Sequence, residues 1–331
     1  MEKNNKEDIT NFNIEDVEIN YNIRINGFLI RFNSIEGVIK CVNSREASGS
    51  LEIPKVINGS VVREIGDDAF SYCKGLESII IPDSVTKIGT FAFYECESLT
   101  SIIIPDSVVE IKDEAFKRCK TLKSIKLSNN LKYIPSEMLI YCINLVDIII
   151  PNSVKSIGSG AFEECINLKS VNIPDSVVEI KDGAFAFCES LTSIEIPDSV
   201  IKIYENAFCG CKNLKSVNIP NKLTDISDYM FSRCESLTSI TIPNSVKSID
   251  ICAFSNCKNL KTIVIPDSVN FIGGGVFEEC VNLTTVKISD NISRINEGTF
   301  IGCESLTTVI IPNKTIEIAE DAFIDCKNLI I

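Results

Sequence analysis

A repeat of 23 residues governs what this chain can fold into, because it runs from Pro82 to the end without an insertion or deletion. The repeated phrase reads I-P-D-S-V-x-x-I-x-x-x-A-F-x-x-C-x-x-L-x-x-I-x-I, and one earlier copy begins at Pro54 with five extra residues around Asn58. A fixed period of this size predicts a solenoid, in which each coil buries its apolar face only against its neighbours. Such a molecule offers a long surface rather than one deep pocket.

One copy shows what a single coil should look like. In the copy that runs from Cys96 to Cys119, Ile102 and Ile104 alternate with outward residues, which is typical of a half-buried strand. Pro105 cannot donate to a ladder and ends the strand, and the Asp-Ser pair that follows favours a turn. The Ala115-Phe116 segment fits one short helical or 3₁₀ turn. We therefore expect an α/β-type solenoid, with one parallel strand per coil on the concave face and short loops, 3₁₀ or helical turns on the convex face.

A phenylalanine recurs at one position of nearly every coil, and burying each ring is worth about 1.5–3 kcal/mol. The column consists of Phe70, Phe93, Phe116, Phe162, Phe185, Phe208, Phe231, Phe254, Phe277, Phe300 and Phe323. The copy from Ser128 to Ile150 carries Pro135 and Met138-Leu139 at the corresponding places. This departure predicts a local irregularity on the outer arc.

The two ends differ from the repeat. Residues 1–50 do not follow it: Asn26-Gly27 between alternating residues predicts a β-hairpin, and Val38 to Val42 reads as another short strand. We expect a cap over the first coil, preceded by a mobile Met1–Asn13, and then twelve repeats over residues 51–331. The sequence stops at Ile331 inside a strand, without a polar cap, so either the natural chain continues or another chain covers this edge. Self-association through that edge is one consequence.

Composition excludes several classes of function. The net charge is −13 and no basic stripe is visible, so we expect no nucleic-acid partner. No apolar run is long enough to span a bilayer, and the first residues lack the apolar core of a signal peptide. The sequence contains no histidine, which removes the usual triads and most zinc sites. We expect no catalytic, cofactor-binding or metal-binding residues; a hydrolase that uses carboxylates is the weaker alternative.

Twelve of the fifteen cysteines occupy one repeat position: Cys73, Cys96, Cys119, Cys142, Cys165, Cys188, Cys211, Cys234, Cys257, Cys280, Cys303 and Cys326. They form either a disulfide or metal ladder, or a buried column of small apolar residues. Parallel side chains one coil apart do not give the near-perpendicular dihedral of a disulfide, and metal binding needs clusters rather than a line. We therefore interpret the column as buried free thiols. Many free thiols favour a reducing compartment.

The outward positions of the predicted strands are the candidates for binding. One column is almost entirely hydroxyl-bearing, with Asp147 as its exception, and the other column varies from coil to coil. The candidate partner-binding residues are Ile80, Ile103, Lys126, Asp147, Ile149, Asn172, Glu195, Asn218, Thr241, Val264, Lys287 and Ile310. The isoleucines near the N-terminal end form an apolar contact patch, unless they are present only because β-branched residues suit strands.

Two further columns carry charge. Aspartates after the strands, such as Asp106 and Asp198, are consistent with a calcium ladder, but turn formation explains Asp and Asn equally well and is preferred. A second column alternates in sign between neighbouring coils, which avoids like-charge repulsion. Its pairs are Glu97 with Lys120, Glu189 with Lys212, Glu235 with Lys258 and Glu304 with Lys327.

The phrases Ile81-Pro82-Asp83-Ser84-Val85 and Ala92-Phe93, followed by Cys96 and Leu99, resemble the BspA-like, or treponemal-type, leucine-rich repeats. The resemblance covers residues 51–331. It implies a curved leucine-rich-repeat solenoid and a binding role, since members are usually described as surface or adhesion-related proteins. We expect a non-enzymatic protein-binding solenoid that acts in adhesion or as a scaffold through its concave sheet, with a self-assembling array as the alternative. The family suggests the cell surface, whereas the thiols and the missing signal peptide suggest the cytoplasm.

Overall fold

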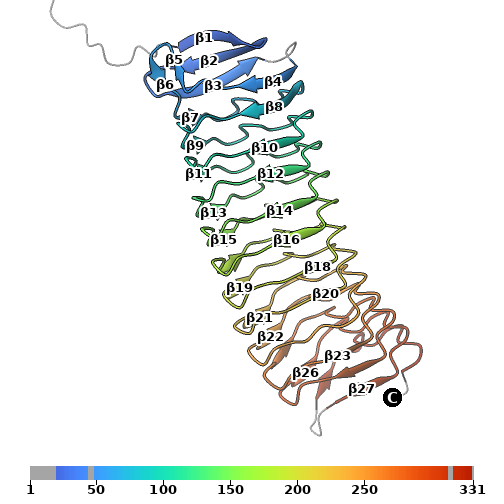
Figure 1. Ribbon diagram of the computed structural model, residues 1–331. Helices are drawn as coiled ribbons and strands as arrows, with labels where there is room; N and C mark the ends of the chain where they lie inside the picture. Colours follow the sequence, from blue (N-terminus) through green and yellow to red (C-terminus); the bar gives the residue numbers. More distant parts are fainter. Residues whose placement is uncertain (1–19, 44–47, 312–315, 330–331) are drawn as a thin grey trace, which may run out of the picture.

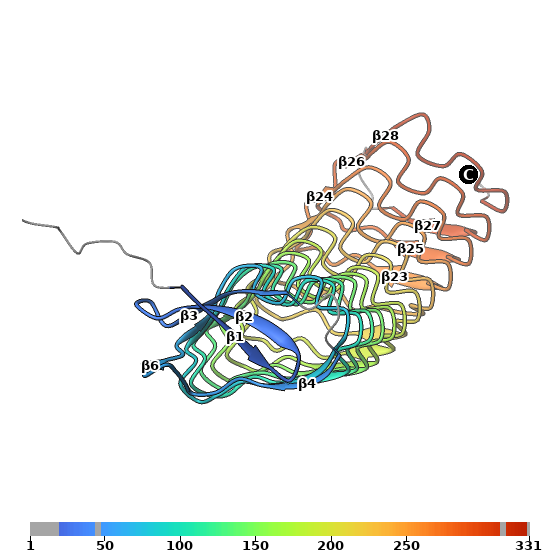
Figure 2. The same ribbon diagram turned by 90° about the horizontal axis from the view of Figure 1, so that it is seen from above.

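The computed structural model describes residues 20–43, 48–311 and 316–329, and of Cys41, Val42 and Asn43 only the backbone. Its coils stack into one elongated solenoid that begins with a small antiparallel sheet (Figure 1). Viewed from above, successive coils shift and rotate slightly, so that the far end is displaced from the near end (Figure 2). The segment expected to be mobile, Met1–Asn13, and the expected open edge at Ile331 lie outside the described residues.

The N-terminal sheet closes the first coil. Strands β1 (Asn20–Ile25) and β2 (Phe28–Asn33) are antiparallel, and Asn26 and Gly27 between them have φ of 48° and 88°. This left-handed pair confirms the predicted hairpin, because such turns match the twist of the strands they join. β3 (Val38–Asn43) adds to β2 and pairs in parallel with β7 (Glu64–Ile65) of the first coil. Phe28 and Phe32 are fully buried in the same core as the coils.

The longer first copy accommodates its extra residues in a hairpin. β4 (Gly49–Glu52) pairs in parallel with β8 (Leu76–Ile80). Between them, β5 (Val56–Ile57) and β6 (Ser60–Val61) form a two-stranded antiparallel ribbon, with Asn58 and Gly59 in its turn. The insertion therefore projects from the coil without changing how the next coil stacks.

A parallel ladder follows the predicted strands in segments of two or three paired strands, with partners 23 residues apart, as in Ser101↔Ser124. Inward and outward residues alternate along these strands, so Ile102 is buried whereas Ile103 is exposed. The strands are β10 (Ser101–Ile103), β12 (Ser124–Lys126), β14 (Asp147–Ile149), β16 (Ser170–Asn172), β18 (Ser193–Ile194), β20 (Ser216–Val217), β23 (Thr262–Val264), β25 (Thr285–Lys287) and β27 (Thr308–Ile310). We call the outer side of this ladder the strand face.

A second parallel ladder was not predicted, and the expectation of one strand per coil is wrong. It begins at β7 and continues through two-residue strands that end in the isoleucine of V-x-x-I: β9 (Lys87–Ile88), β11 (Glu110–Ile111), β13 (Tyr133–Ile134), β15 (Ser156–Ile157), β17 (Glu179–Ile180), β19 (Lys202–Ile203), β21 (Asp225–Ile226), β22 (Ser248–Ile249), β24 (Phe271–Ile272), β26 (Arg294–Ile295) and β28 (Glu317–Ile318). These strands form because the backbone must find partners between coils: the N–H of Lys112, for example, donates to the carbonyl of Ile88 at 2.9 Å.

The predicted helical or 3₁₀ turn at Ala-Phe is not confirmed, since the residues that the structure describes contain no helix and consequently none that crosses a membrane. Two residues of nearly every such segment have left-handed φ, for example Glu114 (61°) and Arg118 (60°), and this conformation interrupts any helix. The N–H groups of Glu114, Phe116 and Arg118 donate to carbonyls of the next coil, at 2.9–3.0 Å. Hydrogen bonds between coils therefore replace those that a helix would make within one coil.

The phenylalanine column is confirmed as the centre of the core. Neighbouring rings stack nearly parallel, with centroids 5.0–5.8 Å apart, and Phe70 to Phe300 are fully buried. At the aberrant copy, Met138 and Leu139 are fully buried in the Ala-Phe places, so the coil itself is not distorted there. The second ladder is interrupted between β11 and β13, where Pro135 has no N–H to donate. It is also interrupted between β19 and β21 and between β24 and β26, so the expected irregularity is not peculiar to the aberrant copy.

Candidate functional site

A groove of about 1610 Å³ lies on the strand face. Its floor is formed by β12, β14, β16, β18 and β20, where buried residues such as Ile148 alternate with exposed ones. One rim is formed by the turns that follow these strands, including Asn152, Asp175, Asp198 and Asn221. Since strands supply its floor, the strand face is the hollowed side of the solenoid in this region.

The structure places all twelve candidate residues on the strand face, and every one of them is exposed. Six line the groove: Lys126, Asp147, Ile149, Asn172, Glu195 and Asn218. Ile80 and Ile103 precede the groove along the solenoid, and Thr241, Val264, Lys287 and Ile310 follow it. Eleven of these residues form one column along the solenoid, and Asp147 lies beside it in the hydroxyl-bearing column. The middle part of the column is recessed.

Exposed aliphatic side chains lie within the groove and on both sides of it along the solenoid. The exposed fractions are 60% for Ile80, 64% for Ile103 and 75% for Ile149, and Val264 and Ile310 are also exposed beyond the groove. Lys126 interrupts the first group, since it pairs with Ile103 across β10 and β12. Isoleucine side chains in strands are usually buried, so side chains exposed to this degree offer apolar surface for contact with a partner.

Asn218 has a structural task that its sequence position does not reveal. Its Oδ1 accepts the N–H of Ile196 at 2.9 Å, and its Nδ2 donates to the Ile196 carbonyl at 2.7 Å. In other coils, the corresponding N–H donates to a backbone carbonyl of the next coil, as Ile104 does to Lys126 at 2.9 Å. The amide of Asn218 thus replaces a ladder hydrogen bond where β18 and β20 are shortest, and it is engaged within the solenoid.

Two aspartates that follow strands, Asp198 in the rim and Asp106 before the groove, link neighbouring coils. Asp106 Oδ1 accepts the backbone N–H of Asn129 at 2.9 Å, and Asp198 accepts that of Asn221 at 2.9 Å. These donations, chiefly from the backbone, hold the pKa of both carboxyl groups below its usual range. Within each turn, the N–H after Asp-Ser bonds to the proline carbonyl, as Val108 does to Pro105 at 3.0 Å. The geometry supports the turn interpretation over a calcium ladder.

The cysteine column is buried from Cys73 to Cys303 and half-buried at Cys326. No cysteine whose side chain is described forms a disulfide. From Cys96 onward, each thiol of the cysteine column donates to the backbone carbonyl at the phenylalanine position 26 residues earlier, as Cys188 does to Phe162 at 3.2 Å. That carbonyl also accepts the N–H of Cys165 at 3.1 Å, so the thiol uses its second lone pair. Burial raises the pKa of Cys188 well above its usual value and that of Cys257 to about 12. The interpretation as buried thiols is confirmed.

Charged side chains on the turn side also link coils. Lys212 with Glu189, Lys258 with Glu235 and Lys327 with Glu304 pair at 2.6–3.2 Å, as the alternating column predicts, whereas Glu97 pairs with Lys74 of the preceding coil. Exposed pairs of this kind contribute little to stability, because water and salt screen the two charges.

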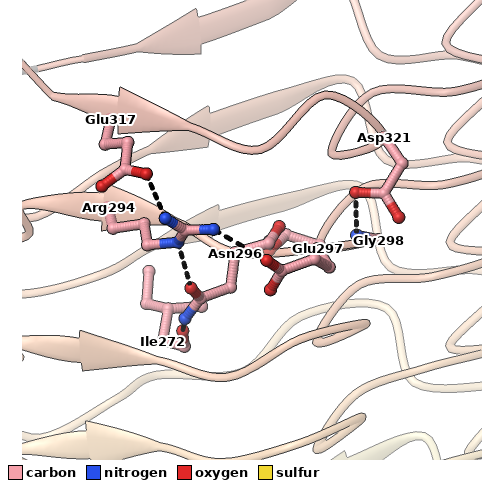
Figure 3. Close-up of polar contacts among 8 residues, drawn as sticks. Ile272, Arg294, Asn296, Glu297, Gly298, Glu317 and Asp321 are labelled. Atoms are coloured by element: carbon pink, nitrogen blue, oxygen red, sulfur yellow. Dashed lines mark hydrogen bonds and ion pairs between the residues drawn. The ribbon is translucent and has the colours of Figure 1, made fainter.

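A larger network joins β24, β26 and β28 near the C-terminal end (Figure 3). Arg294 binds Glu317 of the next coil, donates to Glu297 at 2.7 Å and donates through Nε to Asn296 at 2.8 Å. Asn296 in turn donates to the carbonyl of Ile272 at 2.6 Å, and Asp321 accepts the N–H of Gly298 at 3.2 Å. The contacts run between coils, so we interpret the network as architectural.

A second hollow of about 370 Å³ on the turn side contains three carboxylates, from Glu137, Glu163 and Asp182, beside Cys209. Burial, together with Glu137 and Glu164, raises the pKa of Glu163, and burial also raises the pKa of Cys209. A thiol with a raised pKa is a weak nucleophile. Within the described ranges, no group of three or more Cys, Asp or Glu side chains is arranged to hold a metal ion.

Comparison with known proteins identifies the repeat. The family model described as "BspA type Leucine rich repeat region (6 copies)" matches residues 47–153, 132–250 and 224–330. A leucine-rich repeat protein from Bacteroides ovatus is 29% identical, with a TM-score of 0.67 and 93% of each chain covered. A leucine-rich cell surface protein from Faecalibacterium prausnitzii is 26% identical, with a TM-score of 0.55, covering 90% of this chain and 96% of that one. A comparison with functionally curated proteins finds no match.

Proposed function

The chain belongs to the BspA-type leucine-rich repeat family, and on that basis we propose that it is a non-enzymatic solenoid that binds a partner protein on its strand face. The observation that carries the proposal is the groove of about 1610 Å³, which coincides with the variable column of the repeat. The fold uses the phenylalanine, cysteine and isoleucine positions for its core. Specificity therefore rests on the exposed column and the rim beside it.

The lining of the groove suits recognition better than catalysis. Serine hydroxyls, asparagine amides and Ile149 offer hydrogen-bonding and apolar contacts spread along five strands. The chain has no histidine to act as a general base for those hydroxyl groups. A shallow polar surface with an exposed apolar residue is typical of protein recognition.

Two roles fit such a binding surface. The similarity to a protein described as a leucine-rich cell surface protein supports adhesion. From Cys96 onward the thiols of the column form no disulfide, which supports a scaffold in a reducing compartment, because exported proteins usually oxidise their cysteines.

A peptide-display experiment tests the proposal. A random library of short peptides is selected on the wild-type protein, and the enriched peptides are measured again on Ser193→Trp, which fills the groove with a neutral side chain, and on Ile149→Asn. The matched control is Ser293→Trp, an exposed serine beside the second ladder. We expect enriched peptides to lose binding to both groove variants and to retain it on the control. Enriched peptides that bind all three variants equally would rule out the strand-face site.

A further inference from the structure

The charge of the groove is one-sided. Its lining contains four carboxylates, from Asp147, Asp175, Glu195 and Asp198, and a single ammonium group, from Lys126, which gives a net charge of −3. The donation from the next coil keeps Asp198 ionised, since it lowers the pKa of that carboxyl group. The asparagines of the lining add acceptor oxygens without adding positive charge.

The basic residues of this region lie on the other flank. Lys123, Lys169 and Lys215 are exposed just before β12, β16 and β20, outside the residues that line the groove. On this side of the strand face the carboxylates of Asp175, Glu195 and Asp198 lie where strands end, opposite the ammonium groups that lie where strands begin. Lys126 at the end of β12 and Asp147 at the start of β14 are the two exceptions. A charged occupant of the groove faces the carboxylate flank.

We propose that the groove binds an extended basic segment of the partner protein. The lysine or arginine side chains of this segment point at the carboxylates of Asp175, Glu195 and Asp198. This inference rests on the proposed function, and it adds the chemistry of the partner. Opposite charges attract across a recessed surface more strongly than on an open one, because less water screens them.

The dimensions of the groove set the length of the segment. Five stacked strands, each about 4.8 Å from the next, span about 19 Å. An extended chain rises about 3.3 Å per residue, so about six residues fill the groove when they run along the solenoid axis. Such a segment meets Lys126 and Ile149 at one end and the acidic rim at the other. We therefore expect its basic residues to be concentrated at one end.

A second copy of the same chain fits this groove poorly. If two grooves faced each other, the two acidic linings would repel, since each carries a net charge of −3. An acidic segment meets the same repulsion. The charge of the lining thus favours a basic partner over both alternatives.

The test uses the peptides that Ser193→Trp excludes, synthesised with a fluorescent label. We expect them to carry a net positive charge, and to bind Glu195→Lys about tenfold more weakly, because the substitution replaces attraction by repulsion at the rim. Glu205→Lys makes the same charge change on the turn side and should leave their affinity unchanged. Raising the salt concentration should weaken binding to the wild type more than to Glu195→Lys.

The outcomes separate the two proposals. If no peptide is excluded by Ser193→Trp, the proposed function itself fails. If peptides are excluded but are neutral or acidic, or bind Glu195→Lys as well as wild type, the groove is a binding site and the basic-segment inference is wrong. A concentration-dependent dimer that Glu195→Lys disrupts in sedimentation measurements would also overturn the inference, since it would identify a second copy as the occupant.

Discussion

The phenylalanine stack permits a quantitative test of how the solenoid is stabilised. Phe185 is fully buried, and its ring stacks on Phe162 at 5.2 Å and on Phe208 at 5.6 Å. Phe162 has a ring neighbour on one side only, because the preceding coil carries Leu139 at this position. Replacing either residue by leucine copies a side chain that the column already accommodates.

The expected costs follow from the number of rings lost. An offset-stacked aromatic pair contributes about 0.5–1.5 kcal/mol beyond the area it buries. Phe185→Leu removes two such pairs and should lower the free energy of unfolding by about 1–3 kcal/mol, whereas Phe162→Leu removes one pair and should cost about half as much. Phe185→Ala, which also leaves a cavity, should cost about 3–5 kcal/mol.

Urea unfolding followed by circular dichroism measures these differences. The midpoints can be compared directly when the slope of the free energy of unfolding against urea concentration is the same for all variants. Stability in a solenoid is mainly a sum over nearest neighbours, so the count of lost neighbours is the relevant variable. Equal shifts of the midpoint for Phe185→Leu and Phe162→Leu would refute the reasoning, since ring stacking would then contribute nothing beyond burial.

Three further predictions follow from single contacts. Burial raises the pKa of Cys257 to about 12, so a thiol reagent at pH 8 should modify it only after unfolding; rapid labelling of the native protein would contradict this. The hydrogen bonds from Asn129 lower the pKa of Asp106 in the folded state. The ionised carboxyl group therefore stabilises the fold above the pKa it has in the unfolded chain, and this stabilisation is lost as the pH falls through the pKa it has in the folded state. Asp106→Asn should reduce the acid sensitivity of unfolding below about pH 4, measured by circular dichroism. Gly210→Ala should destabilise more than Gly183→Ala by about 1–3 kcal/mol in thermal unfolding, because both have left-handed φ but only the new Cβ at 210 would lie 2.4 Å from the ring of Phe187; equal losses would exclude the clash.

Much of the architecture was predictable because the repeat states it many times. Period, apolar alternation and proline placed the strand of each coil, and Asn26-Gly27 placed the hairpin. The second ladder was missed since a two-residue strand is too short to show a period of two. The helical expectation at Ala-Phe failed because local preference competes there with hydrogen bonds to the next coil, which a single copy does not contain.

The candidate site was predictable as a column but not as a groove. Alternation identified which residues point outward, and variation between copies identified the column that the core leaves free. Recession of the middle five strands arises from the way the coils stack, which no single copy contains. From the sequence, the aspartates after the strands are candidates for turn formation or calcium binding and not for part of a binding surface. In the structure, Asp175 and Asp198 line the same groove as Glu195.

The sequence by itself determined the period, the strand register and the buried columns, because each coil repeats the same short-range pattern and meets an identical neighbour. Only the tertiary structure decided where the strand face is hollowed and on which flank its carboxylates gather. Those features arise from the stacking of coils whose residues are 23 positions apart, and no contact within one copy contains that information.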